Sequence, residues 1–141
     1  MKPIERSITV HMEVVGKARP KVTFTGAGVM AYTPKKTVEA EALIKQEWIT
    51  RHGRNSQFKG AVAVTIVTER RLPASRPNRV QVEDDTFKPD VDNVAKLVLD
   101  ALNKVAYEDD KQVTELTVQK LPRRRKDFEG IHITVEGKIE G

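Results

Sequence analysis

Six acidic side chains are concentrated in a short span of the sequence, KPDVDNVAKLVLDALNKVAYEDDKQV at residues 88–113, with Lys96 among them. Clustered carboxylates oppose one another's ionisation, and a divalent cation relieves that repulsion. Ligand sets made only of oxygen favour Mg²⁺ or Mn²⁺. The span therefore predicts a divalent-metal site, provided that the fold brings the carboxylates together. The acidic residues are Asp90, Asp92, Asp100, Glu108, Asp109 and Asp110.

Each of these carboxylates also has an ordinary structural interpretation. Acidic residues are enriched in the first turn of helices, because they accept hydrogen bonds from free N–H groups and face the positive end of the helix dipole. Asp90 could cap a following helix, and the Asp-Asp pair at 109–110 could form a hydrophilic turn. The joint spacing favours a site, since Asp92, Lys96 and Asp100 recur every four residues and share one helix face.

Lys96 has two roles that the sequence leaves open. As a compact cation it could neutralise negative charge on a group bound at the site. It could instead pair with Asp92 or Asp100 one turn away and orient them. A surface ion pair of this kind contributes only about 0.3–0.5 kcal/mol.

Other metal and nucleotide motifs are absent from the sequence. An EF-hand that starts at Asp90 would need Gly and Glu where this chain has Ala95 and Ala101. The three histidines are scattered, no HExxH occurs, and neither GxxxxGK[ST] nor GxGxxG is present. The chain has no cysteine, which excludes disulfides and thiolate metal sites and is compatible with a reducing cytoplasm.

Four segments have the β-branched, partly alternating pattern of strands. The most apolar of them, at residues 60–69, is predicted to be central in its sheet. Glycines, prolines and short β-like pieces at residues 16–34 predict a long loop or a small hairpin, and residues 70–87 predict a long surface loop. The strands are expected at residues 6–15, 60–69, 112–121 and 130–139.

Two helices are expected between these strands. The first starts at Thr33 and Pro34 and ends near His52, and the second covers residues 92–105. The element order predicts an α/β (α+β) fold, a single domain over residues 1–141 with a small mixed sheet and two main helices packed on it. The expected apolar faces are Val38, Ala42, Trp48 and Ile49 in the first helix, and Val94, Leu97, Val98, Ala101 and Leu102 in the second.

The composition predicts a soluble globular protein with an anionic partner. The 141 residues are 38% hydrophobic and 32% charged, and the net charge is +5. The chain opens on a charged segment rather than a signal peptide, and no apolar run approaches the roughly 20 residues of a membrane span. We therefore expect a cytoplasmic protein with no membrane partner.

The acidic span resembles the signature of the RusA-like Holliday-junction resolvases, which are small bacterial and phage endodeoxyribonucleases. Their pattern is an aspartate, one residue, Asp-Asn, and a lysine four residues after the second aspartate. An Asp-Ala-Leu segment and an Asp-Asp turn follow before a strand. The matching residues are Asp90, Asp92-Asn93, Lys96, Asp100-Ala101-Leu102 and Asp109-Asp110, and GKARPK and YTP near the N-terminus resemble the phage-type branch.

This resemblance implies a homodimer that binds four-way DNA junctions and makes paired nicks with Mg²⁺ or Mn²⁺. It leaves open whether Asp109 or Asp110 is the third metal ligand, and which role Asp100 has. The catalytic residues that it implies are Asp90, Asp92, Lys96 and Asp110, with the three aspartates as metal ligands.

The basic residues depart from the best-known form of this family, which has a dense arginine run directly before the first aspartate. This chain has EDDTFKP there, with its arginines displaced upstream. Phosphate contacts are expected from two basic turns and the upstream loop, although a solvated surface explains the N-terminal group equally well. Trp48 and the few other aromatic residues are expected in the core. The predicted DNA-binding residues are Lys17, Arg19, Arg70, Arg71, Arg123, Arg124 and Arg125.

Three functions compete at this point. The first is a metal-dependent, structure-selective DNA endonuclease of the resolvase type. The second is a catalytically silent DNA-binding module of the same fold, and the third is a metal-binding or structural assembly protein without a DNA partner. The intact aspartate and lysine set favours the first, because a silent relative would be free to lose it.

Overall fold

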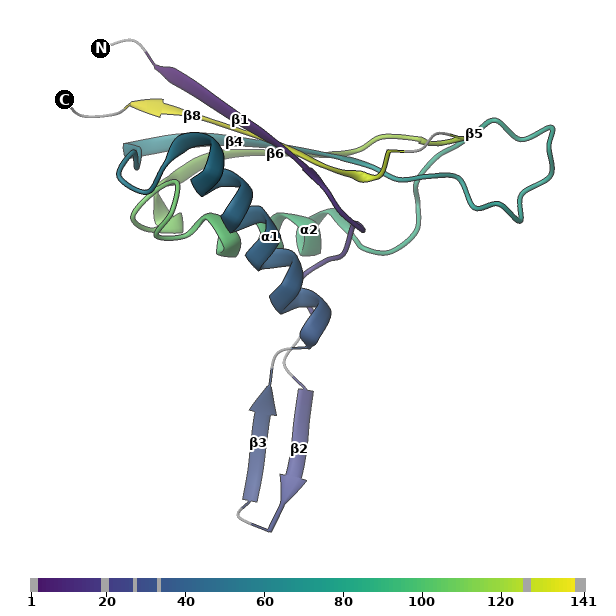
Figure 1. The fold of residues 1–141 in the computed structure, drawn as a ribbon, viewed down its shortest axis with the longest axis horizontal. Coiled ribbons are helices and arrows are strands. Elements are labelled where there is room, and N and C mark those ends of the chain that lie inside the picture. Colours follow the sequence, from purple (N-terminus) through teal and green to yellow (C-terminus); the bar gives the residue numbers. More distant parts are fainter. Residues whose placement is uncertain (1–2, 19–20, 27, 33, 126–127, 139–141) are drawn as a thin grey trace.

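The computed structural model describes residues 3–18, 21–26, 28–32, 34–125 and 128–138. Within them, a four-stranded mixed sheet has the strand order β1-β8-β4-β6, and two helices cover one of its faces (Figure 1). This confirms the expected α+β fold with a small mixed sheet and two main helices. The sheet strands are β1 (Ile4–His11), β4 (Lys59–Glu69), β6 (Val113–Lys120) and β8 (Gly130–Lys138), and the helices are α1 (Lys35–His52) and α2 (Val91–Leu102).

Strand β4 lies in the interior of the sheet, as its apolar sequence predicted. It pairs antiparallel with β8 and parallel with β6. Alternate side chains on β4, including Val64 and Ile66, are buried against the helices. Because β4 and β6 are parallel, the chain between them must cross from one end of the sheet to the other, and α2 lies within that crossover.

Strand β1 is shorter than the sequence predicted, because its partner ends. His11 lies opposite Gly130, the first residue of β8, so no neighbouring strand continues the ladder. Met12 and Val14 remain buried, and the Glu129 side chain accepts a hydrogen bond from the Val14 amide at 3.0 Å. The expected strand at residues 6–15 is therefore a strand followed by a buried extended segment.

Helix α2 has the apolar face that the sequence predicted, and it ends earlier than expected. Val94, Leu97, Val98, Ala101 and Leu102 are all buried. The helix stops at residue 102 rather than 105, and residues 104–106 form a turn between the bridged residues Asn103 and Tyr107. No helix in the described residues is long and apolar enough to cross a membrane.

The apolar face expected for α1 is wrong in part. Trp48 is fully buried as predicted, but Val38 is 52% exposed and Ala42 is also on the surface. The buried positions are instead Thr37, Ala40 and Ile44 together with Trp48. The sequence of α1 places alanines and charged residues on all sides of the helix, so its amphipathic pattern is weak. Tertiary packing therefore decides which side faces the core. The expected cap Thr33 lies outside the described residues.

Two projections extend from this body in different directions (Figure 1). The first is an antiparallel hairpin of β2 (Lys21–Thr25) and β3 (Gly28–Tyr32). For this region the sequence predicted either a long loop or a small hairpin, and the structure has the hairpin. The second, called the arm below, consists of residues 70–88 and includes β5 (Val82–Glu83). Strand β5 pairs with β7 (Arg123–Arg124), which lies in the basic turn between β6 and β8.

Candidate active site

Asp90 and Asp92 lie at the N-terminal end of α2 with their carboxylates exposed. Asp90 occupies the N-cap position, yet its side chain makes no capping hydrogen bond. Asp92 lies in the first turn, and neither carboxylate has a hydrogen bond or ion pair to another described residue. The structural interpretation as a helix cap therefore does not account for Asp90. Both carboxylates face the positive end of the helix dipole and are free to bind a ligand.

Lys96 is exposed on the same helix and has no ion pair within the described residues. The pairing with Asp92 or Asp100 that its spacing allowed is not formed. Asp100 pairs instead with Lys17, at 3.2 Å between Oδ2 and Nζ. The Lys96 ammonium group is thus an unneutralised cation one turn along from Asp92.

A strap formed by residues 16–17 crosses α2 and connects the base of the hairpin to it. The Lys17 amide donates to the Asn93 carbonyl at 2.9 Å. A Cβ atom on Gly16 would lie 2.8 Å from Cβ of Asn93 and 2.9 Å from Cβ of Pro89, so only glycine lets the strap lie this close. The strap therefore holds the segment that carries Asp90.

Lys17 connects the strap to both helices. Its Nζ lies 2.9 Å from Oε1 of Glu41 and 3.2 Å from Oδ2 of Asp100. Burial would lower the pKa of Lys17, but its hydrogen bonds to Glu41 and Asp100 outweigh that effect and raise the pKa. Lys17 was predicted to bind DNA, and in this structure its charge is already neutralised by two carboxylates.

Asp109 and Asp110 have different surroundings at the opposite end of α2. The Asp109 carboxylate accepts a hydrogen bond from the Lys111 amide at 2.9 Å, and it caps the short helix η1 (Asp110–Gln112) together with the Gln112 side chain. The Asp110 amide donates to Oδ1 of Asn103 at 3.0 Å, and its carboxylate is exposed. Asp109 therefore has a structural role, and Asp110 is the member of the pair that can bind a ligand.

The pKa values of the two aspartates shift in opposite directions. The hydrogen bond from the Lys111 backbone lowers the pKa of Asp109. Partial burial raises the pKa of Asp110, and its neighbours Asp109 and Asp100 raise it further. Burial also raises the pKa of Tyr107, with Asp110 and Asp100 adding to the effect, so its hydroxyl stays protonated and donates to the Leu99 carbonyl at 2.9 Å.

The structure does not bring Asp110 to Asp90 and Asp92. Asp110 is bonded to Asn103, and eleven residues of helix separate Asn103 from Asp92, about 16 Å along the axis. Carboxylates that share a Mg²⁺ ion must each place an oxygen about 2.1 Å from it. No three His, Cys, Asp or Glu residues among those described are grouped so that they could hold a metal. A metal site made of Asp90, Asp92 and Asp110 from one chain therefore does not fit this geometry.

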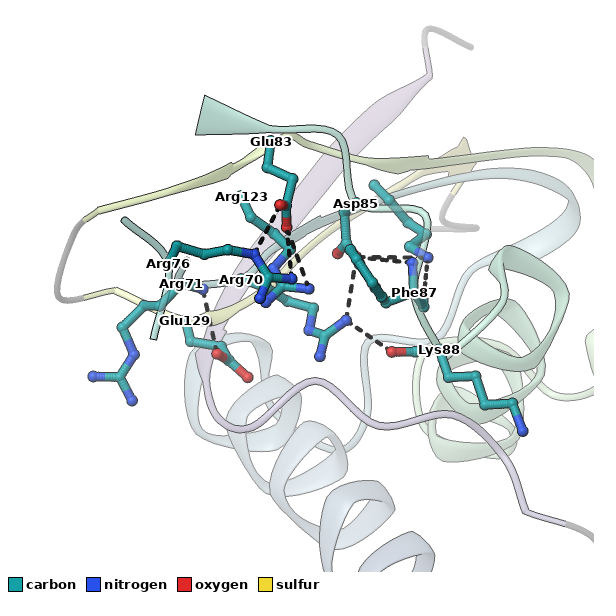
Figure 2. A network of polar contacts seen from close by, with 10 residues as sticks. Arg70, Arg71, Arg76, Glu83, Asp85, Phe87, Lys88, Arg123 and Glu129 are labelled. Atoms are coloured by element: carbon teal, nitrogen blue, oxygen red, sulfur yellow. Dashed lines mark hydrogen bonds and ion pairs between the residues drawn. The ribbon is translucent and has the colours of Figure 1, made fainter. Parts of the chain in front are cut away.

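Asp85 anchors the arm next to Asp90. Its side chain is completely buried, and Oδ1 lies 3.2 Å from Nη1 of Arg70 and 3.9 Å from Nζ of Lys120 (Figure 2). The same Nη1 of Arg70 donates to the Lys88 carbonyl at 2.7 Å. Arg70 thus joins the first residue of the arm to the last, two positions before Asp90.

A second ion-pair group stiffens the middle of the arm. Arg76 donates to both carboxylate oxygens of Glu83, at 2.9 and 3.3 Å, and these bonds lower the pKa of Glu83. Arg123 is buried, lies 4.0 Å from Glu83, and places its guanidinium 4.6 Å from the Phe87 ring centre. The Phe87 ring therefore lies against arginines on the arm and on β7, which is a cation–π arrangement.

Arg125 holds the tip of the arm. Its guanidinium donates to the carbonyls of Val80, Pro77 and Arg76 at 2.9, 2.8 and 3.1 Å. Arg124 is exposed, and no hydrogen bond or ion pair of its side chain involves a described residue. Of the basic turn, only Arg124 therefore has an uncommitted charge in the described residues.

The predicted DNA-binding arginines thus fall into two groups. Arg70, Arg123 and Arg125 are bound within the arm. Arg71 and Arg124 are exposed and available for phosphates, and Figure 2 shows the Arg71 side chain turned away from the network. Arg71 lines a cavity of about 710 Å³ with Arg70 and Arg123, between the end of β1 and the arm. Arg19 lies outside the described residues.

Sequence reasoning missed two carboxylates that shape the site. Asp85 lies in an apparently irregular acidic stretch, and nothing in its local spacing indicates burial. Glu41 lies within a charged helix, and its sequence context is that of an ordinary surface residue. Only the fold shows that it pairs with Lys17. The only available signal for Asp85 was the number of arginines near it in the chain, because a buried carboxylate needs cationic partners.

Comparison with known proteins agrees with this reading of the acidic span. The family model of endodeoxyribonuclease RusA matches residues 11–136. The protein named "Uncharacterized protein YqaN" from Bacillus subtilis (strain 168) is 31% identical over 120 residues, which cover 79% of this chain and 84% of that protein. This chain belongs to the RusA endodeoxyribonuclease family. At the level of the family, it is a nuclease of the type that resolves Holliday junctions.

Proposed function

We propose that this protein is a metal-dependent, structure-selective endonuclease that resolves four-way DNA junctions by paired phosphodiester hydrolysis. One observation carries the proposal. At the N-terminal end of α2, the family's two aspartates and its lysine are exposed, and their side chains have no partner among the described residues. Charged groups without structural partners, placed in a family of nucleases, are most simply explained by binding and reaction.

Lys96 is proposed to neutralise charge on the phosphoryl group. A free ammonium group near a phosphate stabilises the negative charge that develops in the transition state. The absence of an ion pair to Asp92 or Asp100 supports this role over the orienting role. The exposed arginines Arg71 and Arg124 are proposed to contact flanking phosphates, which positions the DNA without reading its bases.

The active form is proposed to be a homodimer that depends on Mg²⁺ or Mn²⁺. Paired nicks in a two-fold symmetric junction need two sites related by symmetry, and a two-fold dimer supplies them most simply. The separation of Asp110 from Asp90 and Asp92 adds a second reason. A partner subunit could place its own Asp110 beside Asp90 and Asp92, which one chain cannot do.

The direct test is a cleavage assay on a synthetic four-way junction, with linear duplex of the same sequence as the control. We expect symmetric nicks in Mg²⁺ or Mn²⁺, none in EDTA, and no cleavage of the duplex. Sedimentation at micromolar protein should report a dimer. Tight junction binding without cleavage in either metal would identify a silent DNA-binding module instead. A monomer both on and off DNA would contradict the proposed paired mechanism.

A further inference from the structure

The hairpin carries an exposed apolar face that the proposed chemistry does not use. Phe24 is 82% exposed, Val29 62% and Val22 56%. Phe24 and Val29 lie directly opposite each other in the β2–β3 register, and Val22 is two residues from Phe24. The three side chains therefore point to the same side of the hairpin. Phe24 corrects the expectation that the aromatic residues lie in the core.

None of the described residues outside the hairpin covers this face. The hairpin projects away from the sheet and helices (Figure 1). A two-stranded hairpin by itself is marginally stable in water, and an aromatic side chain this exposed favours contact with a partner. The partner must accept an apolar ring at the tip of a narrow projection, since Phe24 is one residue from the end of β2.

The charge around the hairpin indicates which partner this is. Residues 14–38 contain no acidic residue and five cations, at positions 17, 19, 21, 35 and 36, of which Lys17 is already paired with Glu41 and Asp100. Lys35 and Lys36 at the base of the hairpin are highly exposed, and their ion pairs to Glu39 and Glu13, at 3.7 and 3.6 Å, are of the weak surface kind. A second copy of this chain also has a net charge of +5 and would repel this segment. A polyanion with exposed flat apolar faces complements it, and DNA with accessible bases has both properties.

We propose that the hairpin enters the branch point of a DNA junction and that Phe24 stacks on a base there. This inference rests on the proposed function for the kind of DNA. Apolar side chains inserted between base steps are a known means of opening and kinking DNA. The cost of unstacking is lowest where base pairing is already interrupted, so a junction favours insertion over a continuous duplex. Strands of five residues span about 17 Å, enough to reach from the protein body to the centre of a junction.

The test measures binding by the full-length protein in EDTA, where cleavage does not interfere. One junction carries 2-aminopurine at the branch point, and a second carries it in the middle of one arm. Wild type should change the fluorescence only of the branch-point probe. Phe24→Ala should abolish that change and weaken junction binding roughly 5- to 150-fold, the range expected for one stacked base, with duplex affinity within about twofold of wild type.

Matched variants separate stacking from other effects. Phe24→Trp should retain junction affinity, and the emission of the new indole should be quenched more by the junction than by duplex. The native Trp48 is fully buried, so its own emission should not respond to DNA. Leu116→Ala removes an apolar side chain, 43% exposed, from strand β6 on the body. That variant should behave as wild type in every assay. Phe24 is at the surface, so thermal unfolding should be the same for Phe24→Ala and wild type.

The outcomes distinguish this inference from the proposed function. A wild type that cleaves junctions, with Phe24→Ala binding and fluorescence unchanged, would overturn the inference and leave the nuclease function intact. A wild type that binds junctions and changes the branch-point signal without cleaving would support the inference and count against the function. Equal wild-type affinity for junction and duplex would overturn the inference whatever the cleavage result. A dimer that Phe24→Ala converts to monomer without DNA would assign the hairpin face to a second copy and overturn it also.

Discussion

The two ends of helix α2 carry carboxylates in contrasting states. At the N-terminal end, Asp90 and Asp92 are exposed and have no side-chain partner among the described residues, and the ion-paired arm holds the backbone that leads into them. At the C-terminal end, Asp100 is neutralised by Lys17, and partial burial and acidic neighbours together raise the pKa of Asp110. Sequence patterns treat these aspartates as one set, whereas the helix separates them. We call the N-terminal end the open end. In the proposed dimer, the open end binds a ligand, and Asp110 at the other end completes the site of the partner subunit.

The largest effect is expected on junction cleavage, from a change at the N-terminal end of α2. Asp90→Asn should reduce junction cleavage by more than roughly 100-fold while junction binding stays near wild type or tightens, since one negative charge near the phosphates is removed. Asp84→Asn, an exposed carboxylate on the arm, is the matched control and should cleave normally. Near-normal nicking by Asp90→Asn would remove the N-terminal end from the active site.

A mixture of two inactive variants tests whether the two ends of α2 act in the same subunit or in different subunits. If Asp110 acts beside Asp90 and Asp92 of the partner subunit, a mixed dimer of Asp90→Asn and Asp110→Asn has one site with both changes and one intact site. An equal mixture should then regain single nicks that neither variant makes alone. If all three aspartates act within one chain, both sites of the mixed dimer are impaired and the mixture stays inactive.

The arm should lose its support when its buried anchor is removed. Asp85→Ala leaves Arg70 and Lys120 without their shared carboxylate, and breaking such a buried charge pair costs about 3–5 kcal/mol. Chemical denaturation should show this loss, and cleavage should fall with it because the arm precedes Asp90. Asp84→Ala should change stability little. An Asp85→Ala protein as stable as wild type would show that the network does not hold the open end in place.

The free and committed arginines near the open end should behave differently on DNA. Alanine at both Arg71 and Arg124 should lower the slope of log affinity against log salt by about 0.9 per phosphate contact, so by roughly 1.8. Arg125→Ala should leave the slope unchanged and lower the melting temperature, because its guanidinium is bonded to three arm carbonyls. Equal slope changes for the free and committed arginines would contradict this division.

A smaller effect, on stability, is expected where Lys17 contacts the C-terminal end of α2. Lys17→Met should destabilise the protein by about 1 kcal/mol at pH 7, a value reduced for partial exposure, while Lys36→Met should have little effect. The folded-state pKa of Lys17 is above its ordinary value of 10.5, so its contribution is fully present below that pH and is lost as the pH rises through the folded pKa. The difference between Lys17→Met and wild type should therefore shrink above about pH 10.5.

The smallest effect is expected from Asp110 on stability. Its folded-state pKa is raised above 3.8, so the folded protein holds this proton more tightly and loses stability as the pH rises through that window. Asp110→Asn should therefore stabilise the protein at pH 7 by about 0.5 kcal/mol or less, and the gain should vanish below about pH 3.8. Asp109→Ala should destabilise instead, because the cap on η1 is lost. Destabilisation by both variants would mean that the two aspartates share one structural role.

The sequence by itself determined the elements with strong local patterns. The apolar run of β4 and the amphipathic face of α2 specify one interior strand and one packed helix, since each buries a continuous row of side chains. The spacing of Asp90, Asp92 and Lys96 on one short segment also follows directly from helix geometry. Helix α1 lacks such a pattern, so its buried face, with Ile44 rather than Val38, depended on its neighbours.

Only the tertiary structure decided which charges are free. Lys17 and Lys96 are equivalent as residues, yet the strap places Lys17 between two carboxylates, whereas Lys96 has no ion pair to any described residue. Arg125 is held by carbonyls 45 to 49 positions away in the chain, and the partners of the buried Asp85 are Arg70, directly after β4, and Lys120 on β6. Ion pairing and burial depend on distances between segments remote in sequence, and local propensity contains no information about those distances. The separation of Asp90 and Asp92 from Asp110 has a different cause, because it follows from the length of the helix that runs between them.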